Sequence, residues 1–494
     1  MNSTIAVSNP IQLILMQINF NTAEKNGNAP APAGVQHGIF PGRGRMTQPT
    51  LVFLHALGAS GREWDLVRRH LPDLPAIAID LPGYGDNADQ GYQDVTAMAD
   101  GLADTIREHR LTACVLVGHS MGGKIATLVA ARAEAGEAGL AGIVGVVLVA
   151  ASPPSPEPIE DDRRAQMIGW VADGPVGRAD AETFVDANTA APLPDPLCEQ
   201  AIADVQRSSR QAWLGWLERG SREDWSAQAG RIAMPALIVA GGEDGDLGEE
   251  AQRKLNLPHY AGGEVRVVEG AAHLIPYEQP QALAELIAGH VAALSPILLP
   301  SGFVRLLGSD RVSRRTRAAM LARTRPVADR DTGWTDAELI TVTALVAHVL
   351  PDCRDDRDLA RRIGVVLNGA GDGWRFADLP PDREAWQRGL ATLDALDGGF
   401  TTRDSTAQAE QLERIAAGEA GSDGEAHLSP RQMMLWFQDV RAEIVRQWMA
   451  TPAAMAAIGY DGFAVGGDGP RKQGYTRTAA ADIEQWQHAP ETIA

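Results

Sequence analysis

The chain has 494 residues, which is more than one hydrophobic core usually organises, so we expect two or three domains. Its formal net charge of −20 argues against a nucleic-acid partner, because phosphate backbones are bound by basic surfaces. The sequence has no run of roughly 18 apolar residues that could span a membrane. The first residues lack a secretion signal, and the cysteines (Cys114, Cys198 and Cys353) form no C-x-x-C pair, so we expect a cytoplasmic protein without a disulfide framework.

Short apolar runs alternate with helix-like stretches over the first 300 residues. Two strand-like runs, Ile11–Asn19 and Val35–Phe40, enclose a loop rich in Pro, Ala and Asn. The later strands are expected at Thr50–His55, Ala76–Asp80, Cys114–Val117, Gly145–Ala150, Ala236–Ala240 and Val265–Val268. Strands that alternate with helices favour a parallel sheet, and therefore an α/β domain.

This alternation is interrupted between the fourth and fifth of these later strands. Residues from about 153 to 228 contain helical pieces, prolines and four tryptophans, Trp170, Trp213, Trp216 and Trp225. We interpret this segment as a helical cap inserted over the sheet. A helix from Pro280 to Leu294 would then close the first domain, which we place at residues 1–298.

Ser120 lies in a Gly-x-Ser-x-Gly motif, Gly118-His119-Ser120-Met121-Gly122. An apolar run precedes the motif and a helix-like segment follows it. In this context the motif is typical of a nucleophile elbow, a sharp turn that lifts the serine above the edge of the sheet. Such a turn strains the serine backbone and needs small residues where strand and helix nearly touch.

A serine nucleophile needs a base to take its proton and an acid to orient that base. His273 follows the last expected strand, and Asp244 follows the strand before it. The chain order Ser, Asp, His is the order of the α/β-hydrolase arrangement. Glu243 and Asp246 remain alternatives for the acid.

Residues from about 35 to 294 resemble the α/β-hydrolase superfamily in five stretches: Leu54–Gly58, Asp80–Gly85, the elbow, Pro235–Asp244 and Gly270–Pro280. The resemblance implies an α/β-hydrolase fold with a helical cap. It implies Ser120 as the nucleophile, His273 as general base and then acid, and Asp244 as the orienting acid. It also implies an oxyanion hole formed by the backbone N–H groups of Met121 and Leu57.

One position departs from the family pattern. The family usually has Gly after the loop histidine, where this chain has Ala56. If this position needs a left-handed backbone, alanine would be strained there, and the assignment of Leu57 would suffer.

The resemblance implies a serine hydrolase that cleaves a carboxylic ester or lactone through an acyl-enzyme, with no metal and no organic cofactor. Two alternatives stay open. Related enzymes use the same three residues to hydrolyse a carbon–carbon bond next to a ketone, as in a β-diketone, and a hydrolase domain that has lost activity could serve as a non-enzymatic assembly subunit. Trp170, Trp213 and Trp216 are candidates for substrate contacts, since an aromatic cap suits an apolar substrate, with ordinary packing as the alternative.

A basic segment separates the two halves of the chain. Residues 299–332 carry eight arginines, Arg305, Arg311, Arg314, Arg315, Arg317, Arg323, Arg325 and Arg330. We interpret this segment as an interdomain linker.

Residues 333–494 are expected to form a separate all-α domain. A capping box, Thr335–Glu338, precedes an apolar helix that ends at Pro351. With the tail from Trp448 to Tyr475, this helix resembles subunit 3 of membrane-bound gluconate 2-dehydrogenase, although the family often has His where Thr451 stands. The resemblance implies a domain for docking to a flavin oxidoreductase, for covering the hydrolase as a lid, or for forming a homo-oligomer.

Overall fold

The computed structural model describes residues 48–91, 93–294, 298–327, 331–351, 356–369, 376–463 and 468. The expected strands Ile11–Asn19 and Val35–Phe40 lie outside the described residues, as does the Gly474-Tyr475 pair of the C-terminal tail.

The N-terminal half is built around a six-stranded sheet in the order β2-β1-β3-β4-β5-β6. Every neighbouring pair of strands is parallel. The strands are β1 Thr50–Leu54, β2 Ala76–Ile79, β3 Cys114–His119, β4 Ile143–Val149, β5 Ala236–Gly241 and β6 Gly263–Val268. Residues of β3, β4 and β5 are buried throughout, as expected of parallel strands covered on both faces. The expected α/β class is confirmed.

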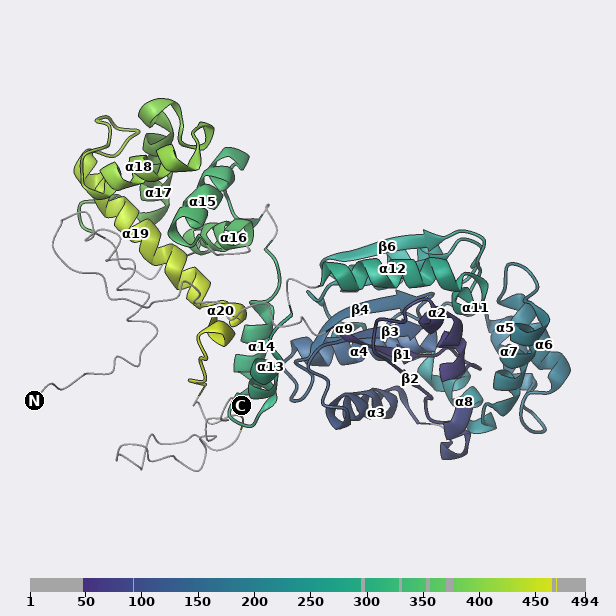
Figure 1. Ribbon diagram of the computed structural model, residues 1–494. Coiled ribbons are helices and arrows are strands. Elements are labelled where there is room, and N and C mark those ends of the chain that lie inside the picture. The colour runs from purple at the N-terminus through teal and green to yellow at the C-terminus, as the bar shows by residue number, and fades with distance from the viewer. Residues whose placement is uncertain are drawn as a thin grey trace, which may run out of the picture.

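Helices cover both faces of this sheet (Figure 1). One face packs against α3 (Val95–Glu108) and α4 (Met121–Glu134), and the other packs against α2 (Asp65–Arg69) and α12 (Pro280–Ala293). Shorter helical turns complete the layers: η2 Gly61–Trp64, η3 Gly85–Gln90, α9 Ser226–Ala229, α10 Glu249–Ala251, η5 Gln252–Asn256, η6 Leu257–His259 and α11 Ile275–Glu278. The sheet is therefore the middle of a three-layer sandwich.

The expected cap lies between β4 and β5 and is helical. Its helices are α5 Asp161–Gly169, α6 Arg178–Ala187, α7 Asp195–Arg207, α8 Arg210–Gly215 and the π-helical turn η4 Trp216–Gly220. They lie together beyond the carboxyl ends of the strands (Figure 1). This is the edge of a parallel sheet at which ligands bind in open α/β folds.

The expected linker, residues 299–332, contains two helices, α13 Ser301–Gly308 and α14 Arg314–Ala322. Both pack against the N-terminal half, and α14 contacts α4. Arg317 is only 2% exposed, because its guanidinium donates hydrogen bonds to backbone carbonyls that include Leu307 O and Gly136 O. Arg317 therefore binds carbonyls at the carboxyl ends of helices, a favourable place for a cation.

The C-terminal half is helical and has its own apolar core, which is consistent with the expected separate all-α domain. Its elements are α15 Asp336–Val349, α16 Asp356–Leu367, α17 Asp382–Ala395, η9 Leu396–Gly398, η10 Phe400–Thr402, α18 Ser405–Ala416, α19 Pro430–Met449 and α20 Pro452–Ala457. The capping box at Thr335 and Glu338 is present. Across the described ranges, no helix combines the length and the apolar character that a bilayer crossing requires.

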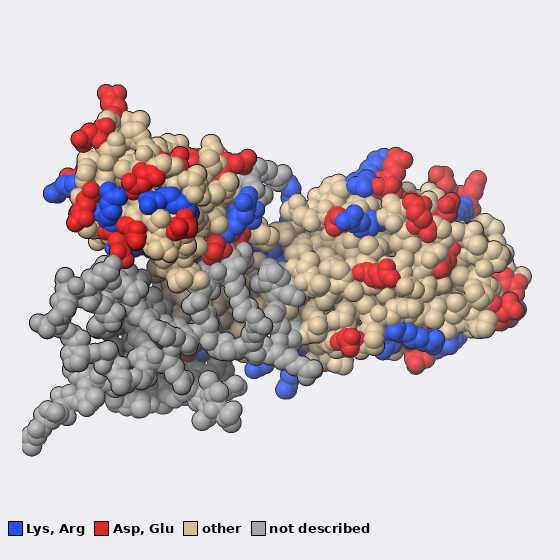
Figure 2. Space-filling model, turned by 45° about the horizontal axis from the view of Figure 1, so that its top comes forward, with Lys and Arg blue, Asp and Glu red and all other residues tan. Residues whose placement is uncertain are grey.

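Acidic and basic side chains are intermixed on the face of the molecule that Figure 2 shows. The charged groups of the cap and of the C-terminal helices alternate in sign, so that face presents no broad area of one charge.

Candidate active site

Ser120 occupies a strained turn between β3 and α4. Its φ and ψ angles are 47° and −117°, a left-handed region that non-glycine residues rarely adopt. The Ser120 N–H donates to Val149 O at 3.0 Å, and the Ser152 N–H donates to Ser120 O at 2.9 Å. These two bonds join the turn to the end of β4 and hold the strained conformation.

Two glycines make this turn possible because strand and helix approach each other closely. A Cβ on Gly118 would lie 2.5 Å from Gly122 O, and a Cβ on Gly122 would lie 2.6 Å from Leu54 O. Neither position has room for any side chain. The expected nucleophile elbow is therefore present as a backbone structure.

The structure joins His273 to Asp244. His273 Nδ1 lies 2.8 Å from Asp244 Oδ2, and because a carboxylate can only accept, Nδ1 carries the proton. Nε2 is then the nitrogen that can accept a proton. The second oxygen, Asp244 Oδ1, accepts from the Asp246 and Leu247 N–H groups at 3.0 and 2.9 Å. Of the three candidates for the acid, Asp244 is the one bonded to the imidazole, whereas Glu243 is exposed and Asp246 forms an ion pair with Arg163.

Burial and charge act in opposite directions on this pair. Burial raises the pKa of Asp244, but the charge and hydrogen bond of His273 and the two backbone N–H groups outweigh it and hold the pKa at about 2. Burial lowers the pKa of His273, but the Asp244 carboxylate outweighs it, so the pKa of His273 is raised. Asp244 is thus ionised at neutral pH, and the His273 imidazole is a stronger base than an exposed histidine.

His119, the residue before Ser120, connects the elbow to the His273 loop. His119 Nε2 donates to His273 O at 2.9 Å, and His119 Nδ1 lies 3.2 Å from Glu63 Oε2. The side chains of His119 and Glu63 are fully buried. A buried polar chain of this kind fixes the loop that carries His273 relative to His119, the residue that precedes Ser120. Glu63 was not expected from the sequence, because nothing in its local pattern indicates a partner far along the chain.

The loop after β1 carries the second expected oxyanion donor, Leu57. His55 Nδ1 donates to Ala56 O at 2.7 Å, and His55 Nε2 accepts from the Leu81 N–H at 2.9 Å. The left-handed residue in this loop is Gly58, with φ 75°, and not Ala56. Alanine is therefore unstrained at its position. Met121 is the first residue of α4, where a backbone N–H has no partner within the helix.

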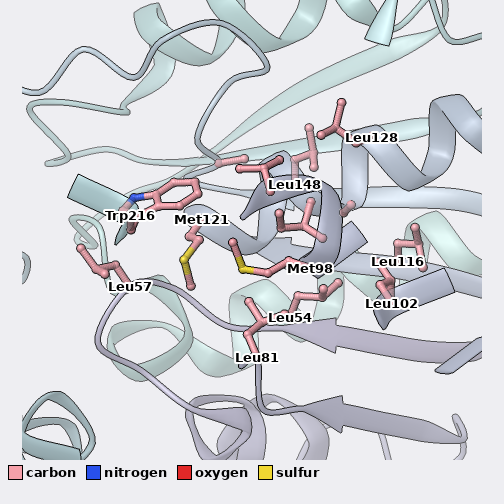
Figure 3. Packing of buried hydrophobic residues seen from close by; sticks show 14 of the residues in the cluster. Leu54, Leu57, Leu81, Met98, Leu102, Leu116, Met121, Leu128, Leu148 and Trp216 are labelled. Atoms are coloured by element: carbon pink, nitrogen blue, oxygen red, sulfur yellow. The ribbon is translucent and has the colours of Figure 1, made fainter. Parts of the chain in front are cut away.

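The three cap tryptophans belong to, or pack against, the buried apolar cluster that includes Leu57. Trp213 is fully buried, and its Cζ3 would lie 3.1 Å from a Cβ on Gly58. Trp170 packs on Trp213, with ring centroids 6.4 Å apart. Trp216 belongs to the same buried cluster as Met121 and Leu57 (Figure 3). Lys124 Nζ lies over the Trp216 ring, 5.7 Å from the ring centroid.

Three polar residues near His273 were missed by the sequence analysis: Glu157, Arg163 and Asn188. The Glu157 carboxylate accepts from Ser152 Oγ at 2.9 Å, and its charge raises the pKa of His273. Arg163 and Asn188 are cap residues that bind each other, with Arg163 Nη2 3.3 Å from Asn188 Oδ1. None of the three belongs to a motif, and only their positions in space reveal them.

The N-terminal half of the chain is similar to known hydrolases and to related synthases. The profile of the Alpha/beta hydrolase family matches residues 51–286. A 2-succinyl-6-hydroxy-2,4-cyclohexadiene-1-carboxylate synthase from Enterobacter sp. (strain 638) is 41% identical over 88 residues, which are 18% of this chain and 34%, about one third, of that enzyme. The enzyme of the same name from Serratia proteamaculans (strain 568) is 27% identical over 251 residues, covering 49% of this chain and 92% of its own.

Two esterases are also similar to the N-terminal half. Esterase Rv0045c from Mycobacterium tuberculosis is 28% identical over 297 residues, covering 56% of this chain and 95% of its own. Among solved structures, an esterase from Exiguobacterium antarcticum aligns with 49% of this chain and 92% of its own, at 22% identity and a TM-score of 0.44.

Proposed function

We propose that the protein, whose N-terminal half matches the Alpha/beta hydrolase family over residues 51–286, is a serine hydrolase that cleaves a carboxylic ester or lactone through an acyl-enzyme. The observation that carries this proposal is the 2.8 Å bond between His273 and Asp244, in a loop bonded to His119, the residue before the strained Ser120.

In the proposed mechanism, Ser120 Oγ attacks the carbonyl carbon of the substrate while His273 Nε2 takes the hydroxyl proton. The negative oxygen of the tetrahedral intermediate is bound by the N–H groups of Met121 and Leu57, each worth roughly 10²–10³ in turnover. His273 then gives its proton to the leaving alkoxide, and an acyl group stays on Ser120. Water attacks this ester by the same steps and frees the acid.

Apolar side chains of the cap lie against the loop after β1 that carries Leu57 and Gly58. This surrounding supports an uncharged, apolar acyl group as the substrate. A Cβ on Gly58 would lie 3.1–3.4 Å from atoms of Trp213, Val205 and Phe184, so apolar side chains enclose the loop. The carbon–carbon alternative uses the same three residues, and the relatives include synthases as well as an esterase. Assays of lactones, p-nitrophenyl esters and β-diketones side by side distinguish these substrate classes.

A fluorophosphonate probe tests whether Ser120 is an activated nucleophile. We expect the wild type to be labelled and Ser120→Ala to be unlabelled. Ser226→Ala, on the short helix α9, is the matched control and should be labelled like the wild type. A wild type that resists the probe and hydrolyses none of the three substrate classes would favour the non-enzymatic assembly subunit.

For the C-terminal half, we propose a docking role toward a flavin oxidoreductase or a second copy of the chain, which rests on the sequence resemblance. The lid alternative is not favoured, because α14, which precedes the C-terminal half, contacts the end of α4 that lies away from the cap (Figure 1). Sedimentation of the full chain, alone and mixed with the oxidoreductase, tests both partners. A monomer that binds no oxidoreductase would contradict the docking role.

A further inference from the structure

One cap arginine bridges the loops that carry the proposed acid and base. The guanidinium of Arg163, on α5, forms an ion pair with Asp246. Its Nη2 also donates to Asn188 Oδ1 at 3.3 Å. A planar guanidinium can bind two acceptors at once, which a lysine ammonium at the end of a flexible chain does less well.

Both partners of Arg163 are attached directly to the proposed catalytic pair. On the acid side, the Asp246 N–H donates to Asp244 Oδ1 at 3.0 Å. On the base side, Asn188 O accepts from the His273 N–H at 3.1 Å and from the Leu274 N–H at 3.0 Å.

The orientation of Asn188 is itself determined by a hydrogen bond. Its Nδ2 donates to Phe184 O at 2.7 Å, which leaves Oδ1 to face Arg163. The bridge is therefore continuous from Asp244 to His273, although its members come from three separate segments of the chain.

We propose that Arg163 is a positioning residue: it ties the Asp244 loop to the His273 loop through Asp246 and Asn188, and so holds the imidazole in place for proton transfer. This inference rests on the proposed hydrolase activity. The bridge would serve geometry more than stability, because the Arg163 and Asp246 side chains are 33% and 42% exposed, and exposed ion pairs contribute little to folding.

Arg163 also acts on His273 through its charge. The charged and titratable groups that face His273 are Asp244, Glu157, Arg163, Glu278 and His119, and Glu63 lies against the far side of His119. The positive charge of Arg163 lowers the pKa of His273, whereas the Asp244 and Glu157 carboxylates raise it. Position and charge can therefore be separated by two substitutions, one that keeps the charge and one that removes it.

The test compares Arg163→Gln and Arg163→Lys with Arg178→Gln in the full-length protein. Arg178 lies on the neighbouring cap helix α6 in exposed ion pairs with Glu199 and Glu182, so it is a matched control. Two quantities are measured: the pH dependence of kcat and KM on an ester substrate, and the downfield proton resonance of the His273 Nδ1–H, assigned with His273→Ala.

We expect Arg163→Gln and Arg163→Lys each to lower kcat by roughly tenfold or more with little change in KM, because misplaced reacting groups slow the chemical step. In Arg163→Gln, the acidic limb of the pH profile should also move to higher pH, since removing the positive charge raises the pKa of His273. Arg163→Lys should keep the limb in place. The Nδ1–H resonance should broaden in both variants, at an unchanged melting temperature, and stay sharp in Arg178→Gln.

Two results would overturn the inference. One is an unchanged kcat and an unchanged Nδ1–H resonance in Arg163→Gln. The other is full recovery of kcat in Arg163→Lys, which would assign the effect to charge alone. If the wild type hydrolyses no ester, the hydrolase proposal fails, but the resonance still decides whether Arg163 holds the His273–Asp244 pair.

Discussion

The behaviour of His273 depends on a small set of charges at the edge of the sheet. Asp244 lies within hydrogen-bond distance of the imidazole, while Glu157 acts on it through space from the segment after β4. Both carboxylates favour the protonated imidazole, so the pKa of His273 is raised above its usual value of 6.5. Because the base must be unprotonated to accept the Ser120 proton, hydrolysis should decline as the pH falls through this raised pKa.

The substitution Glu157→Gln removes one of these charges and keeps a group that can accept from Ser152 Oγ. We expect the pKa of His273 to fall, so that the acidic limb of kcat/KM moves to lower pH, opposite to the direction expected for Arg163→Gln. The pH profile of ester hydrolysis measures this shift. Glu160→Gln, an exposed neighbour on the same segment, is the control and should leave the limb in place. If the acidic limb of the pH profile moves equally in both variants, or in neither, the Glu157 charge does not determine the pKa of His273.

At the scale of elements, the close approach of β1, β3 and α4 determines which residues the elbow accepts. A Cβ on Gly122 would lie 2.6 Å from Leu54 O and 2.8 Å from Leu54 C, and backbone atoms cannot move aside as the end of a flexible side chain can. Gly101, in the middle of α3, has nothing within 4 Å of the same position.

Gly122→Ala and Gly101→Ala form a matched pair of helical substitutions. We expect Gly122→Ala to lower the free energy of unfolding by roughly 1–3 kcal/mol, because the added methyl forces α4 away from β1. Gly101→Ala should raise it by about 0.5–1 kcal/mol, because alanine loses less conformational entropy in a helix. Urea unfolding of both variants measures the two changes. A stabilised Gly122→Ala variant would show that α4 and β1 are farther apart than the structure places them.

At the scale of the whole molecule, α4 connects the elbow to α14, in the segment that precedes the C-terminal half. It begins at Met121, directly after Ser120, and ends at Glu134, where α14 packs. Arg314 Nε donates to Ala135 O at 2.9 Å, and Arg317 Nη1 donates to Gly136 O at 2.6 Å. Cations at the carboxyl end of a helix are favourable, so α14 is anchored at the end of α4 opposite the nucleophile.

Arg317→Met should lower the free energy of unfolding by roughly 3 kcal/mol or more, because several buried backbone carbonyls lose a charged hydrogen-bond donor. Arg315→Met, on the exposed face of the same helix, should change stability by less than about 0.5 kcal/mol. Urea unfolding, followed by tryptophan fluorescence and by limited proteolysis between the two halves, measures the difference. Equal stability of the two variants would contradict the anchoring role of Arg317.

The sequence by itself determined the six strands of the described sheet and the motif positions of the N-terminal half. Apolar runs at strand length, the Gly-x-Ser-x-Gly turn and the order Ser120, Asp244, His273 are local features, and local features follow from neighbouring residues and from chain order. The same reasoning found the capping box at Thr335 and the helical cap. The domain boundaries and the subunit 3 resemblance of the C-terminal half stay predictions.

Only the tertiary structure decided which side chains meet across separate segments. It shows that Asp244, of three acidic candidates, binds His273, and that Glu63 contacts His119. Arg163 binds residues of both the Asp244 loop and the cap segment bonded to His273. The expected linker contains α13 and α14, which pack against the N-terminal half. Each of these contacts joins residues that are far apart along the chain and carry no periodic signal, because hydrogen-bond partners of this kind are specified by the folded backbone and not by sequence neighbours.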